Sequence, residues 1–193
     1  MQYISTRGQD GPLGYEAALL SGLARDGGLY VPEIYPTLSS QQISSFSTKS
    51  YEEVASEIIL PYVSENIEKL ALQKILNKTY SNFHHEKIAP LVELENNKFL
   101  LELIYGPTYA FKDFAMQMIA QMFNQALVKF RRSINIIVAT SGDTGAAAVH
   151  AFRNLEFVNL FVLFPKGRIS EIQRRQMTTE KASNVSIISL DGN

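Results

Sequence analysis

Three continuous apolar runs separated by helical segments constrain the fold of this chain most. They lie at 134–139, 160–164 and 185–190, and the first is rich in β-branched residues. Between them, 146–153 is typical of an alanine-rich helix, and Ser170-Glu171-Ile172-Gln173 fits a capping box that opens a helix to about Lys181. Continuous apolar strands alternating with helices predict a parallel sheet covered on both faces and joined by right-handed crossovers. We therefore expect an α/β fold.

Three strands do not complete such a sheet. Alone, they would leave both edges exposed and the faces incompletely covered. The sequence ends at Asp191-Gly192-Asn193, directly after the third run. We therefore expect residues 133–193 to be the start of a parallel, Rossmann-like domain that is incomplete, and the fold to be truncated.

The first 85 residues are expected to form a mostly helical N-terminal domain. A short strand at 3–6 and a helix at 15–24 precede the breakers Asp26-Gly27-Gly28, Pro32 and Pro36. Apolar spacing predicts helices at 51–60 and 65–77, with Pro61 separating or kinking them. The buried stripe of the second helix should comprise Ile67, Leu70, Ala71, Leu72, Ile75 and Leu76.

Residues 86–132 are expected to contain a hairpin and a lysine-bearing helix. Apolar runs at 91–95 and 98–103 flank Asn96-Asn97, a pair that suits a hairpin turn because asparagine tolerates positive φ. Apolar positions then recur with alternating spacings of three and one, which predicts a long helix with one buried face. These positions are 111, 114, 115, 118, 119, 122, 123, 126, 127 and 130. Lys112 and Asp113 fall in or just before its first turn.

Composition excludes several classes of function. Eighteen basic against 19 acidic residues argue against nucleic acid as a partner. The absence of cysteine excludes disulfides, zinc–thiolate sites and cysteine nucleophiles. No secretory leader and no uncharged apolar run of about 18 residues is present, so we expect a cytoplasmic protein without a membrane partner. The histidines lack partners at metal-ligand spacing, so no metal site is expected, and His150 is expected to pack or to lie on the surface rather than to react.

One segment suited to chemistry is Gly106-Pro107-Thr108-Tyr109-Ala110-Phe111-Lys112-Asp113-Phe114. It places a lysine among aromatic residues at a helix start, where desolvation and the helix dipole both disfavour a charged amine. A neutral amine can form an imine with a cofactor aldehyde or a carbonyl substrate. The same residues fit an exposed lysine whose stem covers Phe111 or Phe114.

The second such segment is Thr140-Ser141-Gly142-Asp143-Thr144-Gly145, between a strand and a helix. Gly142 and Gly145 allow a tight turn and close approach of a ligand, so free amides at the helix start can bind a carboxylate or phosphate. The alternative is that Ser141, Asp143 or Thr144 merely caps the helix. Neither a dinucleotide fingerprint nor a P-loop is present.

Together these segments resemble the threonine synthases, pyridoxal-phosphate enzymes with the fold of the tryptophan-synthase β-subunit (fold type II). The matching motifs are Gly-Pro-Thr-x-Ala-Phe-Lys-Asp-Phe at 106–114 and Ser-Gly-Asp-Thr-Gly-Ala-Ala at 141–147. Further blocks match at 3–8, 26–32 and 164–170, in the order of the family and across nearly the whole chain.

The resemblance implies a lyase of threonine biosynthesis that acts on phosphates and converts O-phospho-L-homoserine and water into L-threonine and phosphate. It implies pyridoxal 5′-phosphate as cofactor, held by the catalytic Lys112 as an internal aldimine, and a small-molecule substrate as the partner. The loop Ser141, Gly142, Asp143, Thr144 and Gly145 would receive the substrate carboxylate. Asp143 would also lie near the phenolic oxygen of the cofactor.

Length is where the chain departs from the family. Members continue with a later glycine-rich turn that holds the cofactor phosphate, and no such segment follows Lys112 apart from the Ser141 loop. We therefore expect an N-terminal portion that is inactive in isolation. Two alternatives stay open, namely a threonine-synthase-like phospho-lyase that does not retain the threonine product and a non-catalytic anion-binding fragment.

Overall fold

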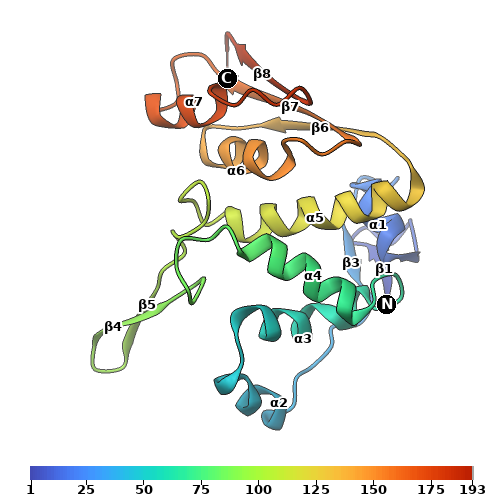
Figure 1. The fold of residues 1–193 in the computed structure, drawn as a ribbon. Helices are drawn as coiled ribbons and strands as arrows, with labels where there is room; N and C mark the ends of the chain where they lie inside the picture. Colours follow the sequence, from blue (N-terminus) through green and yellow to red (C-terminus); the bar gives the residue numbers. More distant parts are fainter. Residues whose placement is uncertain (193) are drawn as a thin grey trace. The chain divides into compact units, whose positions relative to one another are not determined.

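The computed structural model describes residues 1–192 and divides the chain into two compact units, Met1–Lys78 and the residues from Thr79 onward (Figure 1). The first unit holds a small antiparallel sheet and the helices of the first part of the chain, and the second holds the hairpin, the longest helix and the parallel sheet. Within the described part, no helix has the length and apolar character needed to cross a bilayer.

The sheet of the first unit has the strand order β2-β1-β3. Its strands are β1 (Gln2–Ser5), β2 (Leu13–Gly14) and β3 (Tyr30–Pro32), and all pairs are antiparallel. Helix α1 (Tyr15–Ser21) lies between β2 and β3. After β3 come α2 (Ser40–Ser45), a 3₁₀ turn (Phe46–Thr48), α3 (Tyr51–Val63) and α4 (Lys69–Tyr80). The predicted first strand is confirmed. The predicted helix at 15–24 is shorter, because Gly22 adopts a φ of 69° after Ser21.

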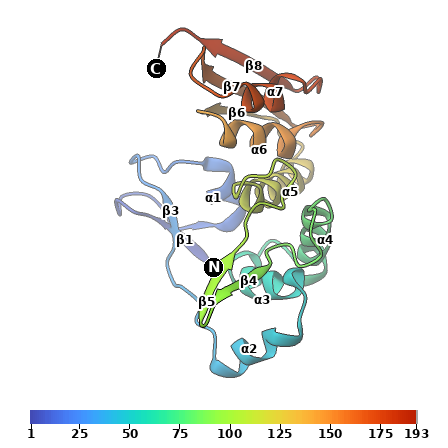
Figure 2. The same ribbon diagram turned by 90° about the vertical axis from the view of Figure 1, so that its left-hand side faces the viewer.

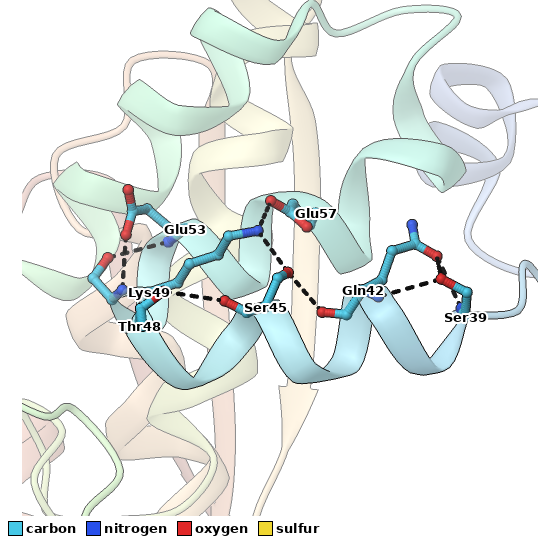
Figure 3. A network of polar contacts seen from close by, with 8 residues as sticks. Ser39, Gln42, Ser45, Thr48, Lys49, Glu53 and Glu57 are labelled. Carbon is cyan, nitrogen blue, oxygen red and sulfur yellow. Dashed lines mark hydrogen bonds and ion pairs between the residues drawn. The ribbon is translucent and has the colours of Figure 1, made fainter.

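Local hydrogen bonds stabilise the α2–α3 segment (Figure 3). Ser39 and Ser50 each accept a backbone N–H three residues ahead at 3.2 Å, forming two complete capping boxes. Between them, the Lys49 ammonium donates to the Ser45 hydroxyl at 3.2 Å and pairs with the Glu57 carboxylate. Since α2 has no buried residue, capping and these polar contacts, rather than core packing, order α2.

Two expectations for the helices of the first unit are wrong. Pro61 lies inside α3, which continues to Val63, and the break before α4 comes at residues 64–68. Proline lacks only its own backbone N–H and disturbs the carbonyl four residues before it, so the residues that follow Pro61 can stay helical to Val63. The stripe of α4 is also narrower than predicted, because Leu70 is 70% exposed whereas Leu72 and Leu76 are fully buried.

The predicted hairpin is present in the second unit. Strands β4 (Leu91–Glu95) and β5 (Lys98–Leu101) pair antiparallel, with Asn97 at a φ of 60° in the turn. β5 ends two residues earlier than predicted. Every residue of both strands is exposed.

The parallel sheet is confirmed, in the order β6-β7-β8. It comprises β6 (Ile134–Ala139), β7 (Val158–Pro165) and β8 (Val185–Leu190), joined by α6 (Asp143–Phe152) and α7 (Glu171–Thr178). Ser170 forms the predicted capping box with Gln173 and opens α7. The helix ends at Thr178 rather than near Lys181.

Only one face of this sheet is covered among the described residues. The β7 side chains Val158, Leu160 and Val162 are at most 1% exposed on the face toward α6. On the other face Ile137 is 69% exposed and Ile188 39%. The expectation of helices on both faces is therefore wrong for this part of the chain. The prediction that three strands leave the sheet incompletely covered is confirmed.

Helix α5 (Asp113–Phe130) packs on α6, so that α6 lies between the sheet and α5 (Figure 2). This two-sided burial explains why Ala146, Ala147 and Ala148 are all small. Met122, Ala126 and Leu127 are buried as predicted, but in the first half of α5 the buried residues lie outside the predicted apolar positions. Phe111 and Phe130, predicted as buried, are 59% and 49% exposed. The most buried positions of α5 are Asp113, Gln117, Ala120, Met122, Ala126 and Leu127.

Candidate active site

Lys112 is the residue immediately before α5, and its side chain is half-buried. Its Nζ lies 4.3 Å from the centroid of the Phe111 ring, and among residues 1–192 it has no hydrogen-bond or ion-pair partner. Tyr109 and Phe111 are 64% and 59% exposed, so the aromatic residues around the lysine do not enclose it as the sequence suggested. Apart from this ring contact the amine is unpaired within residues 1–192, as a nucleophile requires.

The carboxylate of Asp113 organises the loop that precedes Lys112. It is fully buried, and it accepts the Thr108 amide at 2.8 Å and the Thr108 hydroxyl at 2.9 and 3.0 Å. A Cβ added to Gly106 would lie 2.3 Å from the Asp113 Cβ, so only glycine lets the loop fold this closely. Asp113 also opens α5, where the helix dipole favours a negative charge. The sequence offered no sign of this role beyond the position of an acidic residue in the first turn.

The Ser141–Gly145 segment, predicted as a turn, is helical from Asp143 onward. Helix α6 begins at Asp143, so that Asp143, Thr144 and Gly145 form its first turn. None of the residues proposed as caps fills that role. Instead, the Thr140 hydroxyl accepts the amides of Gly142 and Gly145 at 3.0 and 2.9 Å. Gly142 has a φ of 146°, a conformation that a residue with a side chain rarely adopts.

This arrangement leaves donors for an anion. In the part of the chain that the structure describes, no acceptor contacts the amides of Asp143 and Thr144, which open a ten-residue helix. The positive end of the helix dipole adds to their attraction for a carboxylate. The Asp143 carboxylate itself is held by the Gln173 side-chain amide at 2.7 Å.

Helix α7 holds both predicted segments. Gln173 binds Asp143, and Gln176 donates from Nε2 to the Thr108 carbonyl at 3.2 Å. Residues three apart share one helix face, so one face of α7 contacts the loop before Lys112 and the start of α6. The two segments predicted to cooperate are thus brought to the same helix. The role of Gln176 was missed, because a glutamine in a polar helix has no distinguishing sequence signal.

His150 lies on α6 behind Asp113. Its Nδ1 is 3.1 Å from the Gln117 side-chain oxygen, and its Nε2 is 3.0 Å from an Arg153 nitrogen. Burial and the positive charge of Arg153 lower the pKa of His150 from its ordinary value of 6.5. Asp113 and Glu180 oppose this shift, and His84 adds to it. The expectation that His150 packs understated its hydrogen bonding.

The lowered pKa makes folding stability depend on pH. Below about 6.5 the unfolded chain binds a proton at His150 more readily than the folded chain does. We therefore expect the free energy of unfolding to fall as the pH drops through this window, and no such contribution above pH 7. Urea unfolding at pH 7.5 and 5.0 checks this, because His150→Gln should show a smaller loss than the unsubstituted chain. Equal losses in both would contradict it.

Comparisons with known proteins agree with these motifs. Residues 2–80 match the family described as "Threonine synthase N terminus". The chain is 45% identical over 193 residues to a threonine synthase of Pseudomonas aeruginosa, covering 100% of this chain and 41% of that protein. It is 39% identical to mouse threonine synthase-like 2, covering 40% of that protein. The solved structure of a pyridoxal-phosphate-bound threonine synthase from Brucella melitensis superposes with a TM-score of 0.95 at 45% identity, over 100% of this chain and 42% of that one. The chain thus spans about two fifths of the length of these relatives.

Proposed function

We propose that this chain, which matches the N-terminal portion of threonine synthases along its whole length, supplies the cofactor-bearing lysine and the substrate-carboxylate loop of a pyridoxal-phosphate-dependent lyase. The reaction converts O-phospho-L-homoserine and water into L-threonine and phosphate. The observation that carries the proposal is the pairing of an uncommitted lysine amine with open helix amides, both next to one face of α7.

The residues present fit the cofactor and the substrate. An aldehyde requires an amine that is not already paired, and Lys112 has no hydrogen-bond or ion-pair partner among the described residues. A substrate carboxylate requires donors, and the amides of Asp143 and Thr144 supply them. When bound, pyridoxal phosphate supplies an electron sink for negative charge that develops on the substrate carbons.

Within this scheme Lys112 has two roles and each other residue has one. Lys112 Nζ would hold the cofactor and, once released, carry protons to and from the substrate. The amides from Ser141 to Gly145 would orient the substrate carboxylate. Asp143, fixed by Gln173, would lie near the phenolic oxygen of the cofactor.

Catalysis should also require the part of the relatives that this chain does not match. The exposed second face of the parallel sheet supports this proposal, because a parallel sheet is normally covered on both faces, and so does the hairpin, every strand residue of which is exposed. We therefore propose that the 193-residue chain alone forms no threonine.

The experiment that tests the lysine assignment is capture of pyridoxal phosphate by the 193-residue chain. Borohydride reduction followed by peptide mapping should place the adduct on Lys112, and Lys112→Ala should remove both the adduct and the accompanying absorbance band. Lys129→Ala is a matched control, because the Lys129 amine also lies over an adjacent phenylalanine ring on α5. An adduct that survives Lys112→Ala would refute the assignment.

The two other functions predict different results. A non-catalytic anion-binding fragment predicts no adduct at any lysine above the level of Lys129. A phospho-lyase predicts phosphate release without threonine. Measuring both products separates the phospho-lyase from a threonine synthase.

A further inference from the structure

A chain of side chains behind Asp113 has one consistent hydrogen-bond direction. Asp113 accepts at both oxygens, so Gln117 must donate to it from Nε2 at 3.2 Å. The Gln117 oxygen then faces His150 Nδ1, which must carry the proton. His150 Nε2 consequently accepts from Arg153, and Arg153 donates its other nitrogen to Glu180 at 2.7 Å.

The direction cannot be reversed. A guanidinium only donates and an ionised carboxylate only accepts, and these two groups stand at opposite ends of the segment from Arg153 to Asp113. Rotating the Gln117 amide would place its oxygen against the Asp113 carboxylate and a donor against the protonated His150 nitrogen. Since Asp113 and Gln117 are at most 7% exposed, water cannot readily compensate for such a mismatch.

The loop held by Asp113 contains a strained residue. Tyr109, three residues before Lys112, has a φ of 59°, a left-handed conformation that is uncommon for a bulky side chain. Its amide donates to the Gly106 carbonyl at 3.0 Å, and its ring stacks on His84 with centroids 5.3 Å apart. Thr108 is held on one side by Asp113 and on the other by Gln176. Such strain persists only where surrounding contacts enforce it.

We propose that Asp113 is a positioning residue for Lys112, and that the Gln117–His150–Arg153 chain fixes the orientation of its carboxylate. Asp113 holds the strained 106–110 loop and the first turn of α5, and so sets the direction from which the lysine amine meets the cofactor. The inference rests on the proposed function of Lys112. It assigns Asp113 no contact with cofactor or substrate.

The test exchanges the acid and the amide of the contact between Asp113 and Gln117. In Asp113→Asn a donor must face another donor, and in Gln117→Glu two carboxylates meet. The double variant restores one donor and one acceptor, with the original net charge. We expect each single variant to lower the ratio of pyridoxal-phosphate labelling at Lys112 to that at Lys129 by about tenfold, and the double variant to recover most of it. Asp191→Asn, at an exposed aspartate, is the matched control and should leave the ratio unchanged.

One further measurement, hydrogen exchange, separates the outcomes. Hydrogen exchange at the Thr108 amide should accelerate in Asp113→Asn and slow again in the double variant, whether or not Lys112 binds the cofactor. Absence of selective labelling in the unsubstituted chain would therefore defeat the proposed function but leave the exchange pattern to decide the positioning role. A folded Asp113→Asn with unchanged labelling ratio and unchanged Thr108 exchange would overturn the inference. Should that variant not fold, Thr108→Val removes one donor to Asp113 and should show a smaller change in the same direction.

Discussion

Replacing Lys112 by alanine should lower threonine formation by about 10³-fold or more, because one side chain both holds the cofactor and moves the protons. The effect is measurable in a hybrid in which residues 1–193 replace the matching 41% of the Pseudomonas aeruginosa threonine synthase. The match over 193 residues at 45% identity makes this exchange structurally conservative. Threonine and phosphate would be measured together in single-turnover and steady-state experiments.

The hybrid provides its own controls. Lys129→Ala should retain near-normal activity, because Lys129 lies in the last turn of α5, far along the helix from Lys112. The 193-residue chain without the remainder of the relative should form no threonine. A Lys112→Ala hybrid within tenfold of the parent activity would show that this lysine is not essential to the reaction.

Secondary structure in the second unit could be predicted well from local patterns. The β-branched run at 134–139 and the capping box at Ser170 both specify their element locally, and both are found where expected. The hairpin turn at Asn97 likewise follows from the tolerance of asparagine for positive φ. These features depend on neighbours in sequence, which a single chain reveals.

Features that depend on tertiary contacts could not be predicted. The apolar periodicity of α5 marked Phe111 as buried, whereas packing on α6 buries Asp113 and Gln117 instead. The hydroxyl that holds the start of α6 belongs to Thr140, one residue before the first expected cap, Ser141, because the helix begins at Asp143, before its alanines. A polar residue that is buried by a distant partner looks the same in sequence as one on the surface.

Sequence motifs predict the candidate reactive residues but not the side chains that hold them in place. The sequence motifs predict chemistry at Lys112 and at the Ser141–Gly145 segment. In the structure, two glutamines of α7 contact the loop before Lys112 and the Asp143 side chain. For Asp113 the sequence predicts no role beyond membership of the motif around Lys112. Its structural role appears only in the hydrogen bonds, because Thr108, before it in sequence, and Gln117, after it, both donate to its carboxylate.

Gly145→Ala should destabilise the second unit by about 1–3 kcal/mol, the usual cost of adding a methyl group to a full core. The added Cβ would lie 2.5 Å from both the Met177 sulfur and the Thr140 methyl carbon, and 3.1 Å from a Val162 methyl carbon. Met177 is fully buried and Thr140 is β-branched, so neither can move freely. Displacing Thr140 would also weaken its bonds to the Gly142 and Gly145 amides, which hold the start of α6. The measurement is the urea dependence of unfolding.

A double-mutant cycle with Met177→Ala identifies the cause. Met177→Ala alone should cost about 2–5 kcal/mol, because it leaves a cavity beneath α7. The same cavity accepts the new methyl group, so the double variant should be less destabilised than the sum of the two single changes. Gly14→Ala is the control for adding a methyl group without a clash, since its Cβ would meet only the Glu65 carboxylate at 3.9 Å. Strict additivity would mean that contact with Thr140 or Val162, and not contact with Met177, makes glycine necessary at position 145.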